Sequence, residues 1–317
     1  NFNGSSVITV TAQEEGLAHM PISAGGSFNM AINEDGTVSG WGNNSRGQLD
    51  IPEDLSDVVS LSSGSLHTLA LKSDGTVVAW GAGWPYNFGQ ADVPEGLSNV
   101  VSISANYTKS IALHSDGTIT AWGQCGGGSL NLPSEIQGQV AHVDAGAGHI
   151  IAVLTDGTLY GWGGSSELNI PDEFVGMNDF ISAVAGYNFT VALRSNGTVV
   201  AWAKGNNPNQ YVPEGLSDVI AISASGNHTM ALHSNGTVTS WGTDINDNVG
   251  VNGGVISAQP EDLSDVVAII AGTESSLVLQ SDGTIFQWAG EGNIDYDWRN
   301  YSVPDGFVVS MGTLGLS

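Results

Sequence analysis

The apolar positions of this chain fall in short runs that alternate with polar residues, and each run stops at turn residues. Runs such as 67–71 (HTLAL) come before a turn, and runs such as 76–80 (TVVAW) follow it. A third run lies upstream, as in 58–61 (VVSL), and a fourth, shorter one ends at a proline, as in 48–52 (QLDIP) and 90–94 (QADVP). Alternation with a period of two predicts half-buried β-strands. We expect the fourth strand at a sheet edge, because proline cannot donate a ladder hydrogen bond.

A turn signal repeats in register with these runs. Each copy has Asp-Gly or Asn-Gly followed by Thr, and both dipeptides favour a type I′ hairpin turn because its central residues need positive φ. The glycines of these turns are Gly36, Gly75, Gly117, Gly157, Gly197, Gly236 and Gly283, at spacings of 39, 42, 40, 40, 39 and 47 residues. A tryptophan stands five residues after each glycine: Trp41, Trp80, Trp122, Trp162, Trp202, Trp241 and Trp288. This register marks an internal repeat.

Four antiparallel strands per repeat predict an all-β fold, a seven-bladed β-propeller of four-stranded antiparallel blades. The chain 1–317 is then a single domain. Its repeats fall at 19–57, 58–99, 100–140, 141–180, 181–218, 219–265 and 266–306. A lone blade cannot bury its faces, so we expect a closed ring with the repeated tryptophans packed as structural wedges between blades. The segment 307–312 resembles the third run and is expected to close the ring as a terminal strand, while 7–10 is an outer strand or a linker.

Charge speaks against two classes of partner. The sequence has 6 Lys and Arg residues against 32 Asp and Glu residues, which gives a net charge of −26. Nucleic-acid binding needs basic residues against the phosphates, so DNA and RNA are excluded, and anionic membrane surfaces are disfavoured for the same reason. No apolar run is long enough for membrane insertion. The acidic surface suits a saline setting, or only keeps the protein soluble.

The two ends and the single cysteine add little. Cys125 allows no internal disulfide and lies in a glycine-rich loop without a neighbouring base. The chain opens at Asn1 with neither an initiator methionine nor a signal peptide, so we expect a mature fragment or one part of a larger multidomain chain.

The sequence around each turn resembles a known repeat family. The stretch from Ser63 through His67 and Asp74 to Trp80, followed by 89–94 (GQADVP), is similar to the regulator-of-chromosome-condensation (RCC1) repeat and most similar to its bacterial variety. The resemblance spans residues 19–312 and implies a propeller. One relative exchanges nucleotide on a small GTPase and docks on chromatin, which requires basic segments that are missing here.

The bacterial variety includes a propeller-type β-lactamase inhibitory protein, which places aromatic residues directly before the repeated histidine. The matching positions here are Ser27, Leu66, Thr108, Gly148, Asn188, Asn227 and Glu274. None of them is aromatic. The resemblance is nearest to this inhibitor, but the missing aromatic residues speak against β-lactamase inhibition, which stays an alternative.

Strand alternation places the loops of each repeat on two opposite faces. One face carries the Asp-Gly turns and acidic Pro-Glu-Gly-Leu-Ser-Asp connections, and we expect it to be solvated. The other face carries the Ala-Gly loops and the variable loops after each tryptophan, where binding specificity is usually found. Its candidate ligand-binding residues are Trp84, Tyr86, Phe88, Tyr107, Tyr187, Tyr296, Trp298 and Arg299. Trp, Tyr and Arg dominate interface hot spots, and aromatic rings also suit sugars; alternatively, these side chains only cover the blade ends.

Calcium is the one cofactor that the sequence suggests. Two long loops space oxygen ligands two residues apart, as calcium loops do. The candidate metal ligands are Asp244, Asn246, Asn248, Asn293, Asp295 and Asp297. Neither loop has the glycine and the glutamate of an EF-hand, so solvated turn residues are the alternative.

We predict no catalytic residues. His67, His149 and His228 share a repeat position with Phe28 and Phe189, which indicates packing. No nucleophile, metal cluster or phosphate loop departs from the repeat pattern. We therefore expect a non-enzymatic binding module, extracellular or at the cell surface, that recognises a protein or glycan through the variable-loop face. The alternatives are a spacer in a large adhesin and a polysaccharide-active enzyme with a carboxylate pair in the central channel or on that face.

Overall fold

The structure is a computed structural model. It describes residues 21–124, 130–163, 169–205, 207–226, 228–242, 260, 263–273, 275–289, 303–304 and 309. Within these residues the fold is all-β, with 21 strands and two short 3-10 helices, η1 (Ser134–Ile136) and η3 (Pro208–Gln210). No helix in this part of the chain is long and apolar enough to cross a membrane.

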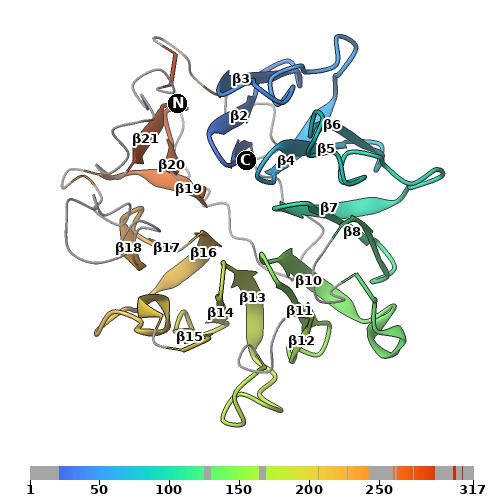
Figure 1. Cartoon of the computed structure of the whole chain (residues 1–317). Helices are drawn as coiled ribbons and strands as arrows, with labels where there is room; N and C mark the ends of the chain where they lie inside the picture. The colour runs from blue at the N-terminus through green and yellow to red at the C-terminus, as the bar shows by residue number, and fades with distance from the viewer. Residues whose placement is uncertain are drawn as a thin grey trace.

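The strands form seven three-stranded antiparallel sheets arranged around a centre (Figure 1). The strands nearest the centre are β1 (Ile22–Ala24), β4 (Val58–Ser63), β7 (Val100–Asn106), β10 (Val140–Ala145), β13 (Phe180–Ala185), β16 (Val219–Ser225) and β19 (Val266–Ala271). The middle strands are β2 (Phe28–Ile32), β5 (His67–Lys72), β8 (Lys109–His114), β11 (His149–Leu154), β14 (Phe189–Arg194), β17 (His228–His233) and β20 (Ser275–Gln280). The outer strands are β3 (Val38–Gly42), β6 (Val77–Gly81), β9 (Ile119–Gly123), β12 (Leu159–Gly163), β15 (Val199–Ala203), β18 (Val238–Gly242) and β21 (Ile285–Ala289).

The predicted fourth strand does not form in the described copies at 48–51 and 90–93. These segments are turns or irregular backbone. In the first of them the backbone N–H of Asp50 bonds the carbonyl of Gly47 at 3.2 Å. The carbonyl of Gln48 accepts the indole N–H of Trp80 at 2.8 Å. Turn hydrogen bonds and the indole of Trp80 thus pair these backbone groups without a fourth strand.

The repeated tryptophans pack between neighbouring sheets, as the sequence predicts. Trp80 of the second sheet lies in one buried cluster with Phe28 and Met30 of the first. In each of the six remaining sheets, the repeated tryptophan likewise joins a cluster with residues of the sheet before it. Each cluster therefore belongs to an interface between two sheets, which is how narrow three-stranded sheets obtain a core.

The first and last sheets meet in the same way. Trp41 and Ile22 of the first sheet share a buried cluster with Leu277 and Leu279 of the last. The indole N–H of Trp41 also donates to the Oε1 atom of Gln287 at 3.0 Å. The seven sheets thus form a continuous series of packed neighbours around the centre.

The hairpin turns fall at the predicted Asp-Gly and Asn-Gly positions, but they are not type I′ turns, because φ is positive at the glycine, as at Gly36 (77°), and not at the Asp or Asn before it. The N–H of Gly36 bonds the carbonyl of Asn33 at 3.0 Å, as in a type I turn followed by a left-handed glycine.

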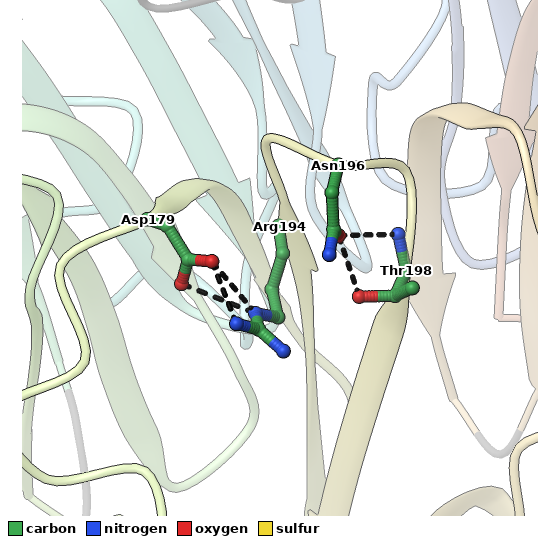
Figure 2. A network of polar contacts seen from close by, with 4 residues as sticks. All are labelled: Asp179, Arg194, Asn196 and Thr198. Carbon is green, nitrogen blue, oxygen red and sulfur yellow. Dashed lines mark hydrogen bonds and ion pairs between the residues drawn. The ribbon is translucent and has the colours of Figure 1, made fainter.

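The polar residues of this turn face have structural roles. In the fifth repeat, the Oδ1 atom of Asn196 accepts the backbone N–H of Thr198 at 3.0 Å and its hydroxyl at 2.7 Å (Figure 2). The carboxylate of Asp179 binds Arg194 beside it, with a shortest distance of 2.7 Å. Asp57 and Asp218 of the connections have left-handed φ angles of 59° and 57°, a conformation that Asp tolerates better than most residues.

Candidate functional site

The variable loops and the Ala-Gly loops lie on one face, opposite the Asp-Gly turns. The backbone N–H of Ala82, just after β6, donates to the carbonyl of Leu66 in the loop between β4 and β5. On the opposite side, the N–H of Val58 bonds the carbonyl of Gly36 at 3.0 Å, which links a connection to a turn. We call the side of the Ala-Gly loops the loop face.

The segment 83–88, which we call the aromatic loop, exposes the aromatic residues predicted in the second repeat. Trp84 is 87% exposed, and Tyr86 and Phe88 are also exposed. The peptide bond between Trp84 and Pro85 is cis. These side chains therefore do not only cover the end of a blade.

Arg46 of the preceding repeat holds one end of the aromatic loop. Its Nη1 atom donates to the carbonyl of Trp84 at 3.1 Å, and its guanidinium lies 4.8 Å from the ring centre of Tyr86. Its own carbonyl accepts the N–H of Gly83 at 2.8 Å. A cation over an aromatic face is attractive, so this arginine fixes Tyr86 as well as the backbone.

Gln90 holds the other end of the aromatic loop from a buried position. Its side chain accepts the N–H of Phe88 at 2.7 Å and donates to the carbonyl of Tyr86 at 2.8 Å. The loop therefore presents its aromatic side chains from a backbone that is bonded at both ends, which reduces the entropy lost when a partner binds.

The structure brings together two other candidates, Tyr107 and Tyr187. Their ring centres lie 6.2 Å apart at an angle of 45°, and each residue is 45% exposed. They occupy the same position in the third and fifth repeats, and Ala147 stands at that position in the repeat between them. Burial raises the pKa of Tyr107. These three residues line a groove on the loop face.

A central cavity of about 170 Å³ lies among the inner strands. Its lining is rich in serine and includes His142 and Asp144 of β10. Asp144 is the one carboxylate among the described residues that line it. A carboxylate pair, which the polysaccharide-active alternative needs in the channel, is not found in this lining.

Asp144 joins three sheets. Its Oδ1 atom accepts the hydroxyl of Ser104 on β7 at 2.8 Å, and its Oδ2 atom accepts the N–H of Ala185 on β13 at 2.8 Å. Burial raises the pKa of Asp144 to about 6, although these hydrogen bonds and the charge of Lys109 oppose the rise. Serines make the same backbone bond elsewhere, as where Ser62 accepts the N–H of Ala105 at 2.8 Å. The bond of Asp144 to Ala185 therefore belongs to a repeated structural pattern.

Lys109 is a feature that our sequence analysis missed. It is 0% exposed and starts β8 at the position that His67 occupies in β5. Its ammonium donates to the carbonyl of Gly146 and, at 3.0 Å, to that of Ala147. The signal was present in the sequence, as a lysine at a position otherwise held by His, Phe or Ser.

Several predicted site residues lie outside the described residues. These are Tyr296, Trp298 and Arg299 among the ligand candidates, and Asp244, Asn246, Asn248, Asn293, Asp295 and Asp297 among the metal candidates. In the part of the chain that is described, no group of three or more His, Cys, Asp or Glu residues could hold a metal ion. The calcium hypothesis stays a prediction.

Comparisons with known proteins agree with the fold. The regulator of chromosome condensation (RCC1) repeat matches residues 22–48, 58–90, 140–167 and 219–248. The comparison with curated proteins found no match. Nearness to the bacterial β-lactamase inhibitory protein stays a prediction.

Solved structures of similar fold come from plants and yeast. The CRINKLY WD40 ectodomain of the Arabidopsis thaliana receptor kinase ACR4 has a TM-score of 0.68 at 16% identity, covering 87% of this chain and 96% of that one. The ectodomain of the Physcomitrella patens receptor kinase CR4 has 0.68 at 18%, covering 86% and 74%. Yeast RCC1 (Prp20), solved bound to Kap60, has 0.62 at 18%, covering 91% and 84%. At these identities the likeness concerns the fold alone. Four segments match the repeat and seven sheets stand in the repeat's register, so the chain carries RCC1-like repeats and resembles an RCC1-repeat β-propeller.

Proposed function

We propose that this chain is a non-catalytic protein-binding module, secreted or displayed at the cell surface, that contacts its partner through the aromatic loop. The observation that carries the proposal is the 87% exposure of Trp84 on a loop bonded at both ends. Together with Tyr86 and Arg46 it supplies the three residue types that dominate interface hot spots. The net charge of −26 favours a partner with a basic surface.

The enzyme alternative has less support. Asp144, the one carboxylate among the described residues lining the central cavity, is engaged in bonds that join sheets. A spacer role in an adhesin offers no reason to hold an exposed tryptophan on a bonded loop. Binding accounts for that feature.

We also propose that the chain at Val309 completes the ring. Val309 is the one described residue of the predicted closing strand 307–312, whose other residues lie outside the described part of the chain. The N–H of Val309 bonds the carbonyl of Gly283 at 2.8 Å. Val58 makes the same bond to Gly36 of the turn before it. Val309 is buried in the cluster that joins the first and last sheets. Both observations support a terminal segment that continues the repeat into the first sheet.

The binding proposal is tested by replacing Trp84 with a photo-crosslinking phenylalanine analogue in the full chain. Exposed to the native medium and irradiated, the protein should form one crosslinked species that a mass spectrometer can identify. The same analogue at Tyr211, which is 60% exposed in another repeat, is the matched control.

The identified partner is then titrated against Trp84→Ala and Tyr211→Ala. We expect Trp84→Ala to weaken binding at least about thirtyfold, because truncating a hot-spot residue costs about 2 kcal/mol or more, whereas Tyr211→Ala should bind normally. Equal affinities of both variants, or crosslinks that appear equally at both positions, would contradict the proposal.

A further inference from the structure

The groove beside Tyr107 and Tyr187 opens onto the loop face at the mouth of the central cavity. It has a volume of about 340 Å³. Its lining consists of Asn106, Tyr107, Ala147, Gly186, Tyr187, Ser225, Gly226 and Thr273. Asn106, Ser225 and Thr273 also line the central cavity, so the two spaces adjoin. No residue of the aromatic loop belongs to either lining, so this is a separate surface.

The groove exists because a small residue separates two large ones. Tyr107 and Tyr187 project from two loops at equivalent positions, and Ala147 takes that position in the loop between them. The 45° angle between the tyrosine rings leaves a wedge above this alanine. One ring can therefore lie flat against a ligand while the other closes its side.

Five polar groups of the lining have no side-chain hydrogen bond to another described residue. They are the amide of Asn106 and the hydroxyls of Tyr107, Tyr187, Ser225 and Thr273. Both donors and acceptors are present among them. By contrast, the hydroxyls of Thr198 and Ser110 elsewhere in the repeats are bonded. The groove thus gathers free donors and acceptors around two aromatic rings.

Charge decides the class of ligand. The lining holds no acidic, basic or histidine side chain. An anion would find no cation in the lining, and the buried ammonium of Lys109 is already bonded to the carbonyls of Gly146 and Ala147. A cation would find no carboxylate in the groove, and the ammonium of Lys109 lies directly beneath, bonded to the carbonyl of Ala147. A neutral ligand that is rich in hydroxyl groups fits this lining.

The rim of the groove is held in shape by hydrogen bonds between successive loops. The N–H of Ala147 bonds the carbonyl of Gly186 at 3.3 Å, and the N–H of Tyr187 bonds that of Gly226 at 2.9 Å. Lys109 fixes the Ala147 loop from below. A site formed in advance lowers the entropy cost of binding a small ligand.

We propose that this groove binds a neutral sugar unit of a glycan, with the apolar face of the pyranose ring on Tyr187 and its hydroxyls on Asn106, Ser225 and Thr273. The volume lies at the lower end of the range for small-molecule sites, which suits one or two sugar units. The site does not depend on the aromatic loop.

The proposal is tested by saturation-transfer NMR on the full chain with a panel of neutral methyl glycosides and disaccharides of glucose, galactose, mannose and N-acetylglucosamine. At least one sugar should bind saturably, with a dissociation constant on the order of 1 mM. Its affinity should stay unchanged between low and high salt, because the sugar is neutral and no charged side chain lines the groove. No saturable binding by any member of the panel overturns the proposal.

Three variants locate the site. Tyr187→Ala should weaken binding at least tenfold by removing the stacking surface, and Ala147→Trp should abolish it by filling the wedge while both tyrosines remain. Tyr211→Ala, at an exposed tyrosine outside the groove, should bind as the wild type does. Equal binding by all three variants overturns the proposal, as does preferential binding of hexalysine at the groove.

The same variants test the sugar-binding proposal and the protein-binding proposal independently of each other. Trp84→Ala should leave the affinity for sugar unchanged, and Tyr187→Ala should leave capture of the protein partner unchanged. Loss of sugar binding in Trp84→Ala would contradict a separate groove.

Discussion

At the scale of single residues, each histidine that starts a middle strand reaches the hydroxyl of the second residue of the next middle strand. The Nε2 atom of His67 lies 3.0 Å from the hydroxyl of Ser110. Pairs of the same kind join His149 to Thr190 at 2.8 Å and His228 to Ser276 at 3.0 Å. These hydrogen bonds tie each sheet to its neighbour, so the histidines are structural, as their exchange with phenylalanine predicts.

The same pairing explains why a lysine stands at position 109. The equivalent position in the next middle strand is held by Ile150, the second residue of β11, which offers no hydroxyl. A histidine at position 109 would leave its ring nitrogen unpaired, whereas lysine reaches the carbonyls of Gly146 and Ala147. The choice of lysine at one strand start is therefore explained by an isoleucine in the next repeat.

A double-mutant cycle tests this relation. Lys109→His should lower the free energy of unfolding by about 1–3 kcal/mol, because buried polar groups lose their partners. Ile150→Thr alone should also destabilise the protein. Combined, they should show a favourable coupling of about 1 kcal/mol, measured by urea unfolding, because histidine then meets a hydroxyl. Additive effects would contradict the pairing.

Acid should destabilise the protein through its buried histidines. Burial lowers the pKa of His67, His142, His149 and His228 to about 4, from 6.5. The hydroxyl of Ser110 donates to the carbonyl of Gln90 at 2.7 Å, so its oxygen accepts the hydrogen bond from the Nε2–H group of His67. The Nδ1 atom of His67 has no partner, and a proton added there would stay unbonded.

The direction of the pH effect on stability depends on which state, folded or unfolded, binds more protons. Between pH 6.5 and about 4 these histidines bind protons in the unfolded chain and not in the folded one, so the free energy of unfolding falls as pH falls. Asp144, whose pKa is raised to about 6, acts in the opposite direction but is a single group. Urea midpoints should therefore drop from pH 7 to pH 5. His67→Phe should reduce this drop, and an unchanged slope in that variant would contradict the assignment.

At the scale of elements, the sequence predicted what recurs within each repeat. The Asp-Gly and Asn-Gly dipeptides predicted where the hairpins fall, and the distance from each turn to its tryptophan predicted the register of the outer strand. The type I′ geometry was wrong, because only the glycine of each dipeptide has a positive φ. The prediction of a fourth strand was wrong in the described copies, because the backbone groups of a proline-terminated run can also be hydrogen-bonded in turns. The wedge of Tyr107 and Tyr187 could not be predicted, since it depends on how far apart equivalent loops stand around the centre.

The turns also predict which glycines are required. Gly157 has a φ of 81°, and a Cβ there would lie 2.2 Å from the carbonyl oxygen of Asn178. Gly176 has a φ of 80°, but a Cβ there meets nothing within 4 Å. Gly157→Ala should therefore lower the melting temperature markedly. Gly176→Ala should cost only the strain of a left-handed alanine, about 1 kcal/mol. Equal melting temperatures for the two variants would contradict the close packing of turn and connection.

At the scale of the whole molecule, stability depends on each sheet having a neighbour on both sides. Every described core cluster joins two sheets, and the cluster around Trp41 joins the last sheet to the first. Such an arrangement has no capping sheet, so a weakened contact at this one junction exposes two sheets at once. The junction also holds Val309, the buried residue of the proposed closing segment.

Val309→Asp tests the junction. The side chain is 1% exposed among Ile22, Ala24 and Leu277, and a carboxylate there would be desolvated without a partner. We expect a lower melting temperature, together with faster amide hydrogen exchange in β1 and β19 than in β10, which lies across the centre in Figure 1. Val175→Asp, at a position that is 65% exposed, is the control and should change neither quantity. If exchange rose uniformly in all seven sheets, the junction would be no weaker than the others, and closure by the terminal segment would be wrong.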